Sequence, residues 1–127
     1  YMEYPSKTRG KFSRQIPEAI INSNSFRESE WMSSHMRTFK YKLWAKIKKE
    51  DFLKEDGSFC DGAWDMIFMF PMLEMCGPRA QFVQDIMYIY NRDNPLNEDK
   101  VNHPKLYRSE TRIRNKTKYE RIIKDDI

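Results

Sequence analysis

A few residues of this chain carry the side chains that acid–base or phosphate chemistry needs. Asp65 begins an apolar stretch and has Trp64 beside it. His35 and Arg37 stand two residues apart, so an extended segment would place both on one face. A carboxylate can accept a proton, a guanidinium forks onto phosphate oxygens, and an imidazole donates a hydrogen bond or coordinates a metal ion. The structural alternatives are a helix-start role for Asp65 and a hydrogen-bonded, non-catalytic role for His35.

The apolar stretch that positions Asp65 is predicted to be a core helix. Within residues 63–76 only Asp65 and Glu74 are charged, and Gly77 is a natural helix end. Asp65 is expected in the first turn, where unpaired N–H groups stabilise an anion by roughly 0.3–1 kcal/mol at an exposed site. Pro71 should bend the helix or restart it as a second one, because proline cannot donate to the carbonyl four residues back. Glu74 is expected to be structural.

Composition indicates one folded domain with a very polar surface. The chain has 127 residues, 39% of them hydrophobic, and a low mean hydropathy of -0.87. Its apolar part is rich in aromatic residues and methionine, which favours order over disorder. A net charge of +4 permits attraction to a nucleotide or a nucleic acid and does not choose between them.

The sequence predicts a cytoplasmic protein without a transmembrane segment. The apolar stretch of about 14 residues is shorter than the roughly 20 that span a bilayer. Cys60 and Cys76 are expected to be reduced thiols, since no secretory signal and no paired Cys/His spacing of a zinc site is visible. Tyr1 is not an initiator residue, so the chain is expected to be a fragment.

The other elements are predicted from shorter patterns. Residues 1–5 are typical of a strand end, and Pro17 should begin a short helical turn. The four-residue spacing within residues 39–47 predicts an amphipathic helix with a lysine-rich face. Residues 81–91 are β-branched and aromatic enough for one or two strands. The residues after Lys105 are predicted to be a basic, solvated helix or tail.

The order of five segments carries a family resemblance. These segments are residues 4–6 (YPS), 34–40 (SHMRTFK), 64–75 (WDMIFMFPMLEM), 88–92 (YIYNR) and 94–97 (NPLN). Together they resemble the C-terminal half of family 2 glycosyltransferases, over about residues 1–102. The His-x-Arg-Thr-Phe-Lys and Tyr-x-Tyr-Asn segments are the more specific parts.

The resemblance implies an α/β architecture, namely the C-terminal portion of a GT-A fold with helices packed on a small mixed sheet. In such enzymes a nucleotide-sugar-binding half with an Asp-x-Asp metal motif comes first, and this sequence contains no Asp-x-Asp. We therefore expect residues 1–104 to be the acceptor-side half and residues 105–127 to be a basic C-terminal helix or tail. A divalent cation, Mn²⁺ or Mg²⁺, is expected mainly from the missing N-terminal half.

The resemblance also assigns roles to single residues. Asp65 falls where the family places its general base, which takes the proton of an acceptor hydroxyl as that hydroxyl attacks the anomeric carbon. Trp64 would stack on the apolar face of an acceptor sugar, with a core position as the competing interpretation. His35 and Arg37 are candidates for contacting the donor diphosphate or the acceptor.

Two further substrate-binding candidates lie in a turn-rich segment. Arg92 and Asn94 follow the last predicted strand, where an α/β fold usually displays ligand contacts, and they would help to close the donor site. A plain surface turn is an equal alternative. No metal ligand is assigned within this chain.

The leading functional hypothesis is therefore an inverting glycosyltransferase of carbohydrate biosynthesis. It would use a nucleotide-sugar donor and a saccharide or other hydroxyl acceptor, and this chain alone is expected to be inactive. Its partner would be the missing half, or a second copy through an exposed apolar face. The alternatives are a basic nucleic-acid-binding module, for which salt-sensitive binding would be the mark, and a non-catalytic remnant of the transferase fold. On the leading hypothesis no nucleic acid partner is expected.

Overall fold

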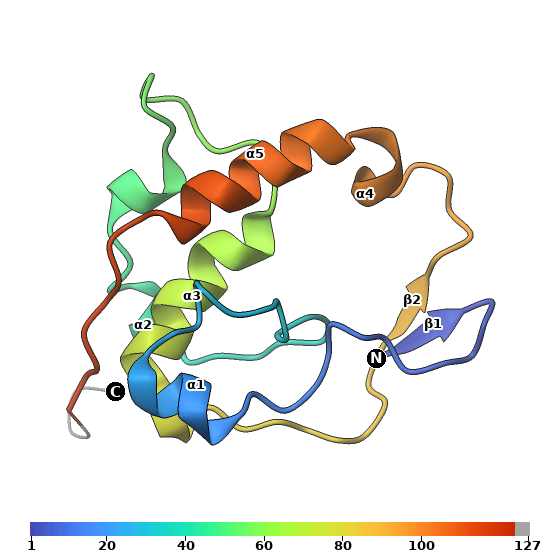
Figure 1. Ribbon diagram of the computed structural model, residues 1–127, viewed down its shortest axis with the longest axis horizontal. Helices are drawn as coiled ribbons and strands as arrows, with labels where there is room; N and C mark the ends of the chain where they lie inside the picture. Colours follow the sequence, from blue (N-terminus) through green and yellow to red (C-terminus); the bar gives the residue numbers. More distant parts are fainter. Residues whose placement is uncertain (124–127) are drawn as a thin grey trace.

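The computed structural model describes residues 1–123 and confirms a small α/β domain (Figure 1). Its elements are β1 (Met2–Tyr4), α1 (Glu18–Ser23), α2 (Tyr41–Trp44), a 3₁₀ turn η1 (Lys49–Phe52), α3 (Trp64–Cys76), a 3₁₀ turn η2 (Gly77–Arg79), β2 (Ile89–Asn91), α4 (Glu98–Val101) and α5 (His103–Arg114). The end of the predicted basic tail, residues 124–127 with Lys124, lies outside the described residues.

The core is built around α3, as predicted. This helix ends at Gly77, whose φ of +54° suits a residue without a side chain. It is buried on nearly every side, and Phe70 and Met75 are 1% and 2% exposed. The helix continues through Pro71, so of the two predicted alternatives, a bend or a restart, the restart as a second helix does not occur. Close packing around Pro71 holds the helical backbone despite the lost donor.

The C-terminal segment is part of the core and not only a solvated tail. Ile113 of α5 is 1% exposed and packs in the cluster around α3. Beyond the helix, Tyr119 N–H donates to Glu74 and Ile122 N–H donates to the carbonyl of Met75 at 2.9 Å, so this segment packs against the C-terminal end of α3. The helix begins at His103, two residues before the predicted start of the basic segment.

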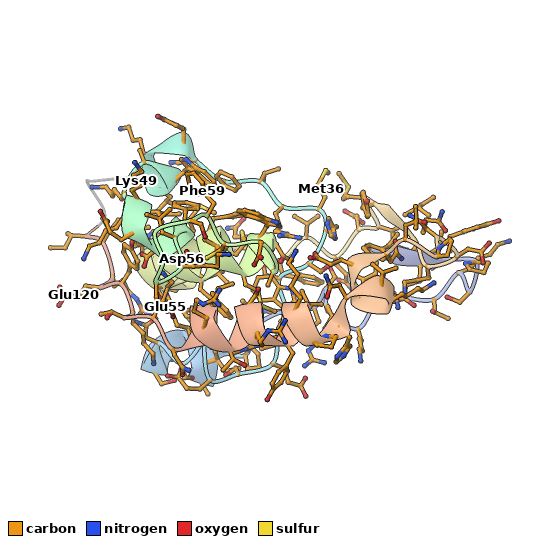
Figure 2. All side chains as sticks on the ribbon, turned by 90° about the horizontal axis from the view of Figure 1, so that it is seen from above. Met36, Lys49, Glu55, Asp56, Phe59 and Glu120 are labelled. Carbon is orange, nitrogen blue, oxygen red and sulfur yellow. The ribbon has the colours of Figure 1, made fainter. Side chains whose placement is uncertain are left out.

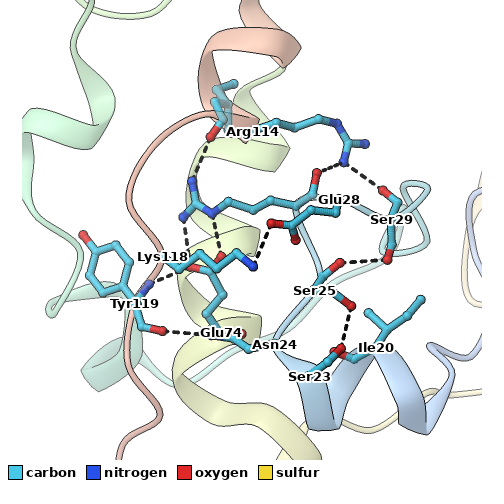
Figure 3. A network of polar contacts seen from close by, with 12 residues as sticks. Ile20, Ser23, Asn24, Ser25, Glu28, Ser29, Glu74, Arg114, Lys118 and Tyr119 are labelled. Carbon is cyan, nitrogen blue, oxygen red and sulfur yellow. Dashed lines mark hydrogen bonds and ion pairs between the residues drawn. The ribbon is translucent and has the colours of Figure 1, made fainter.

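A buried ion pair ties these elements together (Figure 3). Arg27 contacts Glu74 of α3 through two donors, with Nε–Oε1 at 2.5 Å and Nη2–Oε2 at 2.9 Å, and both side chains are at most 2% exposed. The remaining groups are also satisfied, because Arg27 Nη1 donates to the carbonyl of Ile113 and Tyr119 N–H donates to Glu74 Oε2. Glu74 therefore has the structural role predicted for it.

The predicted amphipathic helix over residues 39–47 is largely wrong. Only Tyr41–Trp44 is helical, and Lys40 and Lys48 on either side have extended backbones with ψ of 133° and 139°. The buried residues Leu43 and Ile47 still pack in the core, so their burial fixes the path of this segment. The exposed lysines have no acidic partner within residues 39–47, so no side-chain ion pair stabilises a longer helix there. A nucleic-acid-binding module was expected to use a continuous basic helix, and this segment does not form one.

The sheet is smaller and simpler than predicted. Instead of a mixed sheet, β1 and β2 form one parallel pair, with Met2 opposite Ile89 and Tyr4 opposite Asn91, at one end of the molecule away from α3 (Figure 1). The strand predicted over residues 81–91 is confirmed only at its last three residues. The carbonyl of Tyr88 accepts the N–H of Met2 at 3.0 Å, but residues 81–87 pair with no strand among residues 1–123, so they lack the ladder that a strand needs.

A charged loop lies beside α5 (Figure 2). Residues 53–59 form a tight turn in which Leu53 bridges Phe59 and Asp56 Oδ1 accepts the N–H of Ser58 at 2.9 Å. Glu55 reaches the C-terminal half of α5, where Arg112 Nε lies 3.6 Å from its Oε1.

Both cysteines are free thiols buried in the interior, as expected of reduced residues. Within residues 1–123, no helix combines the length and apolar character needed to cross a membrane.

Candidate active site

Asp65 lies in the first turn of α3 with its carboxylate partly open to solvent. Ala63 precedes the helix in the left-handed conformation, at φ 51° and ψ 40°, and supplies no capping side chain. Asp65 Oδ1 accepts the N–H of Met66 at 3.1 Å, which supports the helix-start interpretation. Its side chain is nevertheless 32% exposed, so the carboxylate is partly open to solvent.

Arg37 is the nearest charged partner of Asp65. Its Nη2 lies 3.2 Å from Asp65 Oδ2, and its Nε donates to the carbonyl of Ser34 at 3.2 Å. The Arg37 side chain is only 10% exposed, and this burial lowers the pKa of its guanidinium. The negative charge of Asp65 acts in the opposite direction and raises that pKa. The fold therefore fixes one positive and one negative charge side by side at the surface end of α3.

His35 lies in the same neighbourhood against two tyrosines. Its ring stacks on Tyr88 with centroids 5.0 Å apart and an interplanar angle of 20°, and Tyr90 lies at 5.5 Å. Burial, followed by the charge of Arg37, lowers the pKa of His35 below its ordinary 6.5. The imidazole is therefore neutral at pH 7 and can both donate and accept a hydrogen bond.

The segment that carries His35 and Arg37 is held in place by an early loop. Ser33 forms a bridge with Ser13, and Ser34 N–H donates to the carbonyl of Phe12 at 2.9 Å. The extended segment predicted around His35 is present only at the Ser33 bridge, because the chain bends at His35 and Met36. The bend leaves His35 against the tyrosines of the β2 region and Arg37 against α3.

Of the two turn residues, the structure connects only Arg92 to this group. Arg92 lies over the ring of Tyr90 at 5.6 Å and pairs with Asp99 at 2.8 Å, a hydrogen bond that raises the pKa of Arg92. Asn94 instead uses Oδ1 to accept the N–H of Leu96 at 3.0 Å. That bond is a local turn contact, and within residues 1–123 Asn94 forms no hydrogen bond with Asp65 or His35.

Trp64 is 48% exposed, so the competing core position is wrong. The residue directly precedes Asp65 in the first turn of α3 and is half exposed to solvent. A half-exposed aromatic ring beside a carboxylate suits a ligand with an apolar face and hydroxyl groups, because the ring takes the face while the carboxylate accepts from a hydroxyl.

Sequence reasoning missed the two tyrosines of this cluster. Tyr88 and Tyr90 are separated by one residue, and that alternation places side chains on the same face of a strand. This alternation could have identified Tyr88 and Tyr90 as neighbours on one face. It could not have shown that they pack against His35. The candidate site therefore consists of Trp64, Asp65, Arg37, His35 and the two tyrosines, with Arg92 at its edge.

A metal site is not formed by these residues. Within residues 1–123, no three His, Cys, Asp or Glu side chains gather closely enough to hold an ion. The divalent cation stays a prediction for residues beyond this set.

Comparison with known proteins adds no family assignment: no family model, curated protein or solved structure matches this chain.

Proposed function

We propose that this chain is the acceptor-side portion of an inverting glycosyltransferase with a GT-A-type fold. The enzyme would transfer a sugar from a nucleotide-sugar donor to an acceptor hydroxyl. The observation that carries the proposal is the position of Asp65, a partly exposed carboxylate 3.2 Å from a buried guanidinium and next to the exposed ring of Trp64. A proton acceptor beside an aromatic platform is what a hydroxyl-bearing acceptor requires.

In the proposed reaction, the acceptor oxygen attacks the anomeric carbon while its proton passes to Asp65. The new carbon–oxygen bond forms as the bond between the anomeric carbon and the diphosphate breaks, and the nucleoside diphosphate leaves with the electron pair. Direct displacement from the opposite face inverts the anomeric configuration. General-base assistance of this kind typically contributes about 10²–10⁴-fold to the rate.

Arg37 would have two successive roles in this reaction. Before transfer, its contact with Asp65 orients the carboxylate. Once Asp65 is protonated, the ion pair loses its attraction, and the guanidinium becomes available to the negative charge that develops on the departing diphosphate. The neutral imidazole of His35 would donate a hydrogen bond to a hydroxyl or phosphate oxygen without adding a charge.

The open side of the sheet supports the expectation of a missing half. The two short strands pair only with each other within residues 1–123, whereas parallel sheets are usually covered and extended on both sides. The adjoining segment also exposes apolar side chains, with Val83 at 61%, Met87 at 59% and Ile89 at 60%. We infer that a nucleotide-sugar-binding half, or a second copy, covers this region, and that the chain alone is inactive.

Acceptor binding can be tested on the chain as it is. The indole N–H groups of its three tryptophans should give three NMR signals, which Trp→Phe variants would assign. Titration with neutral oligosaccharides should shift the Trp64 signal and leave that of Trp31, which packs edge-on to Phe70 at 5.3 Å, unchanged. Asp65→Asn should weaken the shift, because the hydroxyl loses a charged acceptor.

If no saccharide in a broad panel moves the Trp64 signal, or if Trp31 moves equally, the acceptor-site proposal is wrong. A calorimetric titration with nucleotide-sugars and manganese addresses the other half of the proposal. We expect no binding of nucleotide-sugars to this chain alone, since the described residues offer no metal site.

A further inference from the structure

Five lysines lie close together on the segment that forms α2 and begins η1. Residues 39–50 contain these five lysines and a single acidic residue, Glu50. All five are exposed, and they are Lys40, Lys42, Lys46, Lys48 and Lys49. Together with the exposed rings of Phe39, Tyr41 and Phe59, they make up the lysine–aromatic surface.

The fold directs these side chains outward on one side of the molecule. Leu43 and Ile47 are 7% and 9% exposed and pack in the core, so they hold the segment from within. The lysines before, between and after them are left on the solvent side. Figure 2 shows Lys49 and Phe59 along the same edge of the molecule, with α5 along the opposite edge. Charge and exposed apolar area therefore occur on a common side.

Most of the positive charge on this surface has no acidic partner. Within residues 1–123, no ion pair involves Lys40, Lys42, Lys46 or Lys49. The ammonium group of Lys48 lies 5.9 Å from the centre of the Tyr119 ring. Asp51, just beyond the segment, already pairs with Lys116 at 3.8 Å and accepts from the Tyr119 hydroxyl. The described chain thus leaves this charge available to an anionic partner.

Large apolar side chains stand among the lysines. Tyr41 is 76% exposed, Phe59 is 61% exposed and Phe39 is 44% exposed. Below them, Trp44 packs against Phe39 and Phe52 with ring centres 5.9 and 5.4 Å apart. Phe39 is therefore held at the surface by a packed aromatic layer, and the neighbouring rings extend the apolar area that water contacts.

We propose that the lysine–aromatic surface binds an anionic lipid membrane. The ammonium groups contact the acidic headgroups while the lysine stems lie along the apolar boundary. The rings of Tyr41 and Phe59 enter the zone between headgroups and acyl chains, where aromatic side chains are favoured. This binding is peripheral and needs no membrane-spanning helix.

The apolar groups favour a membrane over a single-stranded nucleic acid. Stacking of bases needs open ring faces, but the rings of Phe39 and Trp44 lie nearly parallel, at 12°, against each other. A bilayer needs only exposed apolar area. Met36 supplies more of it without a ring, because it is 55% exposed on the same edge as Phe59 (Figure 2). The inference is independent of the proposed transferase activity, since it uses no residue of that site.

Co-sedimentation of the whole chain with lipid vesicles tests the proposal. One set of vesicles is phosphatidylcholine in which roughly one lipid in three is phosphatidylserine, and the other set is phosphatidylcholine alone. The chain should bind the anionic vesicles at least about tenfold more tightly, because each lysine near an anionic surface contributes about fivefold. A single-stranded oligonucleotide at the same ionic strength is the competing probe.

Two pairs of lysine substitutions separate this surface from general positive charge. Lys42→Gln with Lys46→Gln should weaken binding to anionic vesicles roughly 25-fold, at about fivefold for each lysine. Lys7→Gln with Lys11→Gln is the matched control, because it makes the same charge change at exposed residues beside β1, at the other end of the molecule from α2 (Figure 1). The control should leave the affinity nearly unchanged, since charges beyond a screening length of about 8 Å contribute little.

A third variant tests the apolar part of the surface. Tyr41→Ser with Phe59→Ser keeps the net charge and should still weaken vesicle binding about fivefold or more, because less apolar area leaves water. Attraction by charge alone would not respond to this change. Both side chains are more than half exposed, so the unfolding midpoint should stay unchanged.

The proposal is overturned if the chain does not bind anionic vesicles, or if it binds neutral vesicles equally well. It is also overturned if the two lysine pairs weaken binding to the same extent, or if a folded Tyr41→Ser, Phe59→Ser variant binds as tightly as the unchanged chain. Tighter binding to the oligonucleotide than to the anionic vesicles would assign the surface to a nucleic acid instead.

Discussion

Replacing Glu74 by Gln should destabilise this protein far more than the loss of an ordinary ion pair. Arg27 and Glu74 are almost completely buried, and two short contacts of 2.5 and 2.9 Å join them. With Gln at position 74, the guanidinium keeps its charge in a site where water cannot reach it. Breaking a buried pair from one side costs about 3–5 kcal/mol, a large part of the 5–15 kcal/mol that stabilises a typical domain.

The size of the effect can be expressed as a melting temperature. For 127 residues, an unfolding entropy of roughly 2.1 cal/mol/K per residue converts about 3–5 kcal/mol into a fall of about 11–19 °C. Denaturant unfolding followed by tryptophan fluorescence measures the same loss at constant temperature, and Trp31 against Phe70 reports on this part of the core.

Two controls make this prediction sharp. Glu30→Gln removes the partner of Arg14 in a pair whose side chains are 50% and 78% exposed, and it should cost at most about 1 kcal/mol. The double change Arg27→Met with Glu74→Leu should recover much of the loss, because no unpaired charge remains. A Glu74→Gln variant that loses less than the Glu30→Gln control would refute the reasoning.

Three further predictions follow from burial and exposure. Burial and the hydrogen bond to Asp51 raise the pKa of Tyr119 to about 12, so in an ultraviolet titration Tyr119 should ionise at a higher pH than ordinary tyrosines. The stability of the protein should fall as the pH rises from 10 toward 12. Ionisation of Tyr119 near pH 10 would contradict this prediction. Because the pKa of His35 lies below 6.5 in the folded state, the contribution of His35 to stability is complete above pH 6.5 and is lost as the pH falls through its folded-state pKa. An NMR titration of the His35 ring checks that this pKa is lowered. The exposed apolar segment 82–89 should cause self-association that Val83→Lys reduces, and light scattering showing a clean monomer at high concentration would count against it.

The sequence was sufficient for the central helix because its signals were local and agreed with one another. An apolar run with few charges, an acidic residue in the first turn and a terminal glycine all specify α3 within its own residues. The short helix after Pro17 was predicted for the same reason. The bridge between Ser13 and Ser33, in contrast, joins distant segments and left no pattern in either.

The failures come from competition between segments. In the lysine-rich stretch around Leu43 the apolar residues have helical spacing, yet only Tyr41–Trp44 forms a helical turn. Leu43 and Ile47 are both buried although the helix does not continue between them. The partners Arg27 and Glu74 are 47 residues apart, so no local rule could pair them. At the candidate site, the sequence indicated both Arg37 and Asp65 as candidate residues. It did not indicate that the two side chains lie 3.2 Å apart, because that contact depends on the fold.

The most direct test of the central proposal is a transfer assay with Asp65→Asn in a polypeptide that joins this chain to the nucleotide-sugar-binding half that we propose for it. Asp61→Asn is the matched control, because Asp61 is a nearby surface carboxylate that pairs loosely with Lys54 at 3.6 Å. We predict that Asp65→Asn lowers kcat by about 10²–10⁴-fold with an unchanged circular dichroism spectrum, while Asp61→Asn retains full activity. Full transfer activity in a folded Asp65→Asn variant would contradict the account and remove Asp65 from the mechanism.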